Sequence, residues 1–124
     1  MNPFTRFLTQ WTTNRSLTQF IEHWDRLERL TVLVHRKKMP VATAAPEFAE
    51  VWPWLRQNYG AWRDGLRPYW QQTKAAGFPT QTDPFALLLE LDSPHAIVGN
   101  WRAMQHLPAA REALNRFLQD QPSA

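Results

Sequence analysis

The stretch VWPWLRQNYGAWRDGLRPYWQQTK, residues 51–74, decides the fold that this sequence predicts. Five of its apolar residues are spaced by four, three, four and three positions: Leu55, Tyr59, Trp62, Leu66 and Tyr69. This spacing places them on one side of a helix that turns by about 100° per residue. It predicts a core-facing stripe on a helix that continues past Pro68 with a kink or a break.

A second stripe of four cations lies about a quarter turn from the first on such a helix: Arg56, Arg63, Arg67 and Lys74. Trp52 and Trp70 lie between the two stripes, and Trp54 lies off the apolar one. Rings beside a line of cations suit single-stranded nucleic acid, whose bases stack while its phosphates meet the cations. Exposed tryptophan and arginine are also enriched where protein partners dock. Ordinary burial, with arginine stems lying over the edge of the core, explains the same pattern.

The composition favours helices over strands. Leucine and alanine each occur 14 times among 124 residues, against five valines and two isoleucines, so good helix formers outnumber the β-branched residues that suit a sheet. A chain of this length forms one core. We therefore expect an all-α fold, a single compact domain over 1–124 with about five to seven mostly short helices in an irregular bundle.

Prolines and capping residues predict where these helices begin, because proline is tolerated in the first helical turn. Asn2 before Pro3, Asp83 before Pro84 and Ser93 before Pro94 are the strongest such starts, since each places a capping side chain before the proline. The predicted helices are 3–12, 16–36, one from Pro46 that restarts at Pro53, 84–91, 94–106 and 108–120. Residues 37–45 are the predicted main loop, and 121–124 a frayed tail.

His35, Arg36, Lys37 and Lys38 form a basic run at the end of the predicted helix 16–36. Cations at this position stabilise the negative end of the helix dipole. The same run could contact phosphate or an acidic partner, and the sequence leaves both interpretations open.

No motif in the chain indicates an enzyme. Glu28, Thr31 and His35 share one helix side, but no nucleophile accompanies them. The chain has four histidines and no cysteine, without the spacing of a zinc site, so we expect no metal and no cofactor. A tetrapyrrole held by one axial histidine would leave no spacing signature, and His95 or His106 would then be the ligand.

We therefore expect a non-enzymatic binding or assembly module that contacts a protein partner, or itself, through an aromatic and basic surface. The predicted surface comprises Trp52, Trp54, Arg56, Arg63, Arg67, Trp70, Lys74, His35, Arg36, Lys37 and Lys38. The alternative is a small subunit that binds the backbone of nucleic acid without base specificity, through Arg56, Arg63, Arg67, Lys74 and residues 35–38. The formal net charge of +3 favours nucleic acid or an acidic protein partner alike. A helix-turn-helix over 92–118 is disfavoured because Pro108 would lie in its turn. The longest apolar run is too short for a bilayer, and the absence of cysteine suits the cytoplasm.

Overall fold

Six helices make up the part of the chain that the computed structural model describes, which is residues 3–73 and 82–121, with side chains from Ser16 onward. They are α1 (Pro3–His35), α2 (Val41–Asn58), α3 (Gly60–Trp70), α4 (Pro84–Glu90), α5 (Pro94–Val98) and α6 (Trp101–Gln119). No strand occurs in these two ranges. The predicted all-α class, the single domain and the irregular bundle are confirmed.

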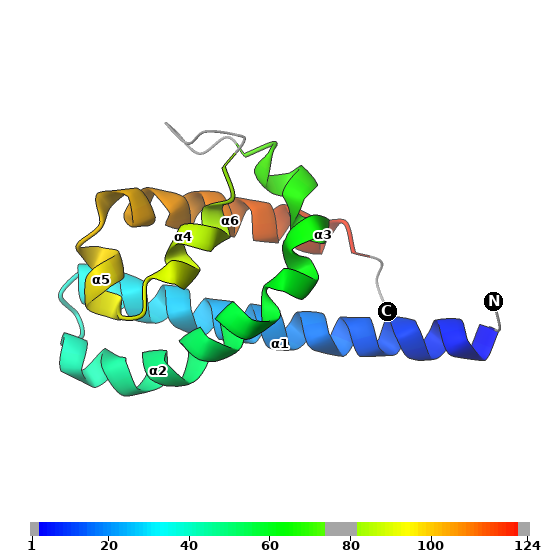
Figure 1. Cartoon of the computed structure of the whole chain (residues 1–124), viewed down its shortest axis with the longest axis horizontal. Helices are drawn as coiled ribbons and strands as arrows, with labels where there is room; N and C mark the ends of the chain where they lie inside the picture. Colours follow the sequence, from blue (N-terminus) through cyan, green and yellow to red (C-terminus); the bar gives the residue numbers. More distant parts are fainter. Residues whose placement is uncertain (1–2, 74–81, 122–124) are drawn as a thin grey trace.

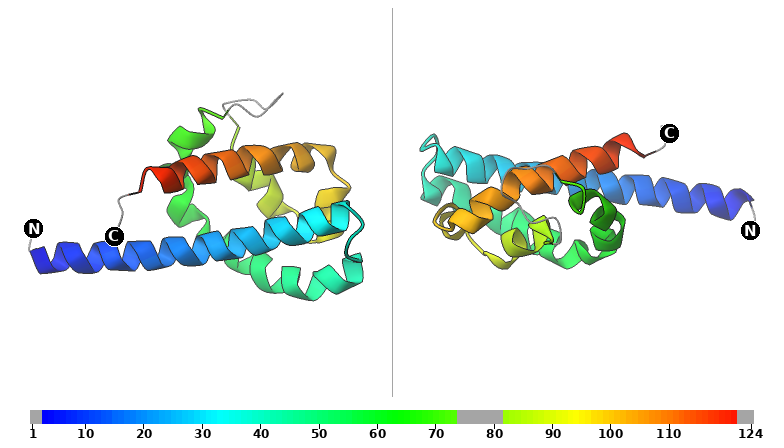
Figure 2. Two further views of the ribbon diagram at one scale, coloured as in Figure 1. Left: turned by 180° about the vertical axis from the view of Figure 1, so that it is seen from behind. Right: turned by 90° about the horizontal axis from the view of Figure 1, so that it is seen from above.

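Two groups of helices, α1 with α2 and α6 with α3 and α4, enclose one core between them (Figure 1). α1 packs mainly against α2, α6 packs against α3 and α4, and α5 contacts α1, α2 and α6. Both groups contribute large buried side chains to this core, including Trp24 of α1, Phe48 of α2, Phe85 of α4 and Leu114 of α6. Figure 2 shows that the N-terminal half of α1 extends beyond the other helices, at the end of the molecule opposite to α5.

The starts of the short helices follow local capping, as the sequence predicts. The Asp83 carboxylate accepts a hydrogen bond from the Phe85 amide at 2.9 Å, and the Ser93 hydroxyl accepts one from the Ala96 amide at 3.1 Å. The side chain of Asn100 caps α6 by accepting from the amides of residues 102 and 103. These caps satisfy amides that the first helical turn leaves without a partner.

Several predicted boundaries are wrong. The predicted break before Ser16 is absent, because no glycine or proline interrupts residues 4–34 and the helix continues. The predicted loop 37–45 shrinks to 36–40, since Val41 opens α2 and Pro46 lies inside that helix. The predicted helices 94–106 and 108–120 are divided at a different place, because α5 ends at Val98, Asn100 caps α6, and Pro108 lies inside α6. Proline has no backbone N–H to donate within the helix, and the burial of Leu107 and Ala109 on either side of Pro108 offsets the missing hydrogen bond.

Residues 51–74 change direction at a different place from the one that the sequence predicts. α3 passes through Pro68, and the chain instead changes direction at Tyr59 and Gly60, between α2 and α3 (Figure 1). This bend lets the two halves of the apolar stripe pack on different helices, α2 mainly on α1 and α3 on α6. Of the predicted frayed tail, 122–124 lie outside the described residues, whereas the Gln121 side chain donates to the Phe117 carbonyl at 3.0 Å.

Candidate partner-binding surface

The apolar stripe of residues 51–74 faces the core despite the bend. Leu55, Tyr59 and Leu66 are buried, while Trp62 and Tyr69 are partly buried against the same cluster. The Tyr59 hydroxyl donates to the Asp83 carboxylate at 2.7 Å. Burial, and the negative charge of Asp83, raise the pKa of Tyr59, so the phenol stays protonated. The predicted core stripe is confirmed.

The tryptophans beside this stripe are largely engaged within the molecule. Trp70 is 3% exposed and belongs to the core, so its predicted role on the surface is wrong. The Trp52 indole donates to the Leu89 carbonyl at 3.0 Å. Trp54 stacks on His23 with ring centroids 3.9 Å apart. Trp52 and Trp54 are thus half-buried and contribute only part of their rings to the surface.

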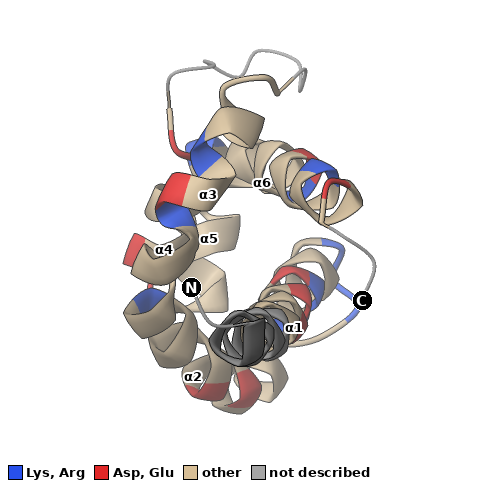
Figure 3. Cartoon of the chain, turned by 90° about the vertical axis from the view of Figure 1, so that its right-hand side faces the viewer, with Lys and Arg blue, Asp and Glu red and all other residues tan. Residues whose placement is uncertain are grey.

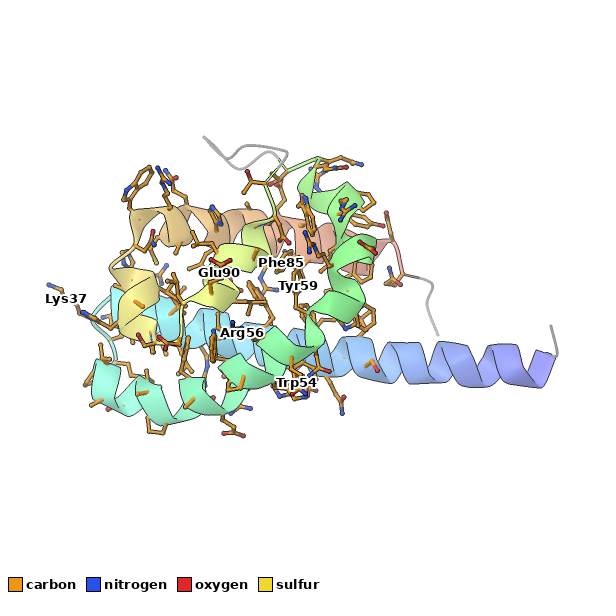
Figure 4. The ribbon with its side chains drawn as sticks, in the orientation of Figure 1. Lys37, Trp54, Arg56, Tyr59, Phe85 and Glu90 are labelled. Atoms are coloured by element: carbon orange, nitrogen blue, oxygen red, sulfur yellow. The ribbon has the colours of Figure 1, made fainter. Side chains whose placement is uncertain are left out.

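The cations of this stretch do not form one line. Arg56 lies on α2, with its guanidinium 5.2 Å from the centre of the Trp52 ring, and Figure 4 shows Trp54 and Arg56 on different sides of that helix. On α3, Arg63 lies 3.9 Å from Asp83 and Arg67 lies 3.3 Å from Asp64. Lys74 lies outside the described residues. The continuous cationic stripe that the sequence predicts is therefore wrong, because the bend at Tyr59 divides it.

Most described arginines have an acidic neighbour, as the interspersed charges on α3 and α6 in Figure 3 illustrate. Ion pairs of the described side chains involve six arginines: Arg26, Arg29, Arg63, Arg67, Arg111 and Arg116. Among the cations with described side chains, five make no ion pair: Arg36, Lys37, Lys38, Arg56 and Arg102. Three of the five are consecutive.

These three cations and His35 are exposed where α1 ends. The Lys38 amide donates to the Leu33 carbonyl at 2.9 Å, and the Lys37 amide donates to the Val34 carbonyl at 3.1 Å. Lys37 has φ of 58°. This is the Schellman arrangement, in which glycine usually takes the left-handed position. Figure 4 shows the Lys37 side chain pointing away from the helices.

The sequence interpretation missed the most exposed large ring. Trp101 is 66% exposed, although its spacing from Met104 and Leu107 suggests a core position. It is the first residue of α6, directly after the Asn100 cap, so no preceding helical turn covers it. The Arg102 guanidinium lies 5.7 Å from the centre of its ring. Position at a helix start, next to a capping asparagine, is the sequence signal that could have identified it.

The three residues considered for catalysis, Glu28, Thr31 and His35, have separate partners or environments. Glu28 accepts a hydrogen bond from Arg111 Nε at 2.8 Å, and the Thr31 hydroxyl donates to the Leu27 carbonyl at 2.8 Å. His35 is exposed at the end of α1. Arg111 also binds Asp25. Among the described side chains no group of three metal-binding residues is found.

The two histidines considered as axial ligands differ in environment. His95 is exposed on the short helix α5, and His106 is half-buried in α6. Burial lowers the pKa of His106, and a hydrogen bond with the backbone of Pro84 opposes this effect. The imidazole of His106 is thereby favoured in its neutral form.

Comparisons with protein-family models, with curated proteins and with solved structures find no match for this chain. Within the described ranges, no helix combines the length and the hydropathy needed to cross a membrane.

Proposed function

We propose that this protein is a non-enzymatic binding module that contacts a protein partner, or a second copy of itself, through exposed basic and aromatic residues. The observation that carries the proposal is the turn at Arg36, Lys37 and Lys38, whose side chains are exposed and make no ion pair. Elsewhere in the described chain, arginines are mostly neutralised by neighbouring carboxylates.

The backbone at this turn adds a second argument. A non-glycine residue in the left-handed region costs about 1 kcal/mol or more, and Lys37 is the described non-glycine residue that adopts it. Strain of this kind is often retained where a side chain is needed for function. A lysine at the position that glycine favours therefore supports a role for its charge in binding.

The test compares the full chain with a Lys37→Gly/Lys38→Gln variant, which keeps the turn and removes two charges. Light scattering over a range of concentrations measures self-association, and affinity capture from extract of the native host identifies protein partners. A captured partner is then purified, and its affinity for both chains is measured. We expect either self-association or binding of a purified partner, weakened in the variant.

Random single-stranded RNA and DNA, titrated at low and moderate salt, provide the opposing outcome. Binding that weakens steeply as salt rises, in a chain that neither self-associates nor binds protein, would replace this proposal with nucleic acid backbone binding. Equal affinity of the full chain and the variant for a purified partner would show that the partner binds at a surface other than this turn.

A further inference from the structure

The unpaired cations of the α1–α2 turn share one end of the molecule with the most exposed apolar side chains. Figures 1 and 2 place the turn, α5 and the start of α6 together at the end opposite to the N-terminus of α1. In the described chain, the exposed large apolar residues are Trp101 and Val41, each the first residue of a helix at this end. We call this surface the basic end: Arg36, Lys37, Lys38, Val41, Trp101 and Arg102.

The basic end carries an excess of positive charge. Four of its six residues are cations, and Asp92, in the connection that leads into α5, is the acidic residue nearest to α5 along the chain. Because Arg102 lies against the Trp101 ring, the largest exposed apolar group of this end has a cation beside it. Tryptophan and arginine are the residue types that most often dominate the energy of protein interfaces.

We propose that the basic end binds an acidic segment of a protein partner, in which an apolar side chain packs on Trp101 and carboxylates meet Arg102 and the cations of the α1–α2 turn. This inference rests on the proposed function and specifies its partner. Opposite charges across an interface speed encounter and fix orientation, while the Trp101 ring would contribute to affinity by becoming buried against the partner.

A second copy of this chain does not fit the basic end. In a two-fold dimer the same surface meets itself, so Arg36, Lys37 and Lys38 would face the identical cations of the other copy. Like charges placed together in this way are costly. The charge pattern thus favours a different, acidic protein over self-association through this surface.

A nucleic acid strand also fits this surface less well. Binding of single strands uses successive rings for successive bases, and the basic end has one exposed ring. The other tryptophans with described side chains are buried or half-buried, and Trp54 is already stacked on His23.

The test is selection of a displayed library of random linear peptides against the full chain, followed by affinity measurement with the selected peptides as synthetic probes. We expect peptides rich in aspartate and glutamate around one large apolar residue. Trp101→Ala is expected to weaken their binding about tenfold or more, and Lys37→Gly/Lys38→Gln to weaken it severalfold. The matched control is Arg29→Gln/Arg116→Gln, which removes two charges elsewhere and should change the affinity by less than about twofold.

Different outcomes separate this inference from the proposed function. Selected peptides that lack acidic residues, or whose affinity is unchanged in both basic-end variants, would overturn the inference. If binding instead falls in Arg56→Gln/Arg63→Gln/Arg67→Gln, the chain is still a protein-binding module, with its surface on α2 and α3. No enrichment of any peptide, together with salt-sensitive binding of random single strands, would overturn both.

Discussion

At the scale of single residues, Lys37 adopts a backbone conformation that is sterically costly for a residue with a Cβ atom. Its φ of 58° lies in the left-handed region, and its amide is bonded in the Schellman arrangement that ends α1. Glycine adopts this conformation without the steric cost that a Cβ atom imposes. The sequence could not indicate this strain, because the basic run predicts only a helix end and not which of its residues turns.

Lys37→Gly is therefore expected to raise the free energy of unfolding by about 1 kcal/mol. Urea denaturation followed by circular dichroism measures the change. Lys38→Gly is the control, because Lys38 has no positive φ and the substitution gains no such relief. A Lys37→Gly protein no more stable than the Lys38→Gly protein would show that the turn is not strained.

The two tyrosines of the central stretch differ in how their hydroxyl groups are placed. Tyr59 is buried and donates to Asp83, while the Tyr69 hydroxyl donates to Asp120 at 2.8 Å in an exposed position. Asp83 also caps α4, so the Tyr59 hydrogen bond connects the bend to the start of that helix. The sequence predicts Tyr59 as core and Asp83 as a cap, but not that they meet.

Tyr59→Phe is expected to lower the free energy of unfolding by about 1.5–3 kcal/mol, because it removes a buried hydrogen bond to a charged acceptor. Tyr69→Phe should cost less than about 1 kcal/mol, since water can replace its exposed bond. Thermal denaturation of both variants at neutral pH compares them. Equal losses would mean that the burial of Tyr59 adds nothing to its hydrogen bond with Asp83.

At the scale of helices, local signals and tertiary packing set different boundaries. The starts of α4 and α5 were predicted from an Asp or Ser before proline, and both caps are formed. The bend at Tyr59 was not predicted, because it depends on which helices the two apolar half-stripes contact. Propensity favours breaks at proline, yet α2, α3 and α6 all contain proline. In α6 the residues on both sides of Pro108 are buried, which offsets the hydrogen bond that proline cannot donate.

Substitution of Gly60, the first residue of α3, tests whether the bend at Tyr59 and Gly60 depends on helix packing or requires glycine. A Cβ atom added there would meet nothing within 4 Å, and the residue needs no positive φ. Gly60→Ala is therefore expected to raise stability by about 0.5–1 kcal/mol, through better helix propensity and a less flexible unfolded chain. Gly99→Ala is the contrasting variant, because its Cβ would lie 3.2 Å from the His95 carbonyl oxygen. If Gly60→Ala destabilises the protein as much as Gly99→Ala does, the bend requires glycine.

At the scale of the whole molecule, charged groups connect distant parts of the chain. Arg111 of α6 binds Glu28 and Asp25 of α1, more than 80 residues away, and Arg26 of α1 binds Glu47 of α2 at 3.0 Å. Such pairings cannot be predicted from helical spacing, which indicates which residues share one side of a helix but not what that side faces. For the same reason the sequence predicts the candidate surface on one continuous helix, whereas four of the five described cations without an ion pair lie where α1 ends and where α6 begins.

Because Arg111 closes α6 onto α1, its removal should affect the whole bundle. Burial alone would lower the pKa of Arg111, but its bonds to Glu28 and Asp25 raise it, so the guanidinium remains charged. Arg111→Ala leaves Glu28, whose side chain is 20% exposed, without its cation. We expect a loss of about 1–3 kcal/mol in the free energy of unfolding.

Arg116→Ala, which breaks the pair with Glu112 on the same helix, should cost less than about 1 kcal/mol. Adding Glu28→Gln completes a double-mutant cycle, and a coupling energy near zero would show that the contact between Arg111 and Glu28 does not hold the two helices together.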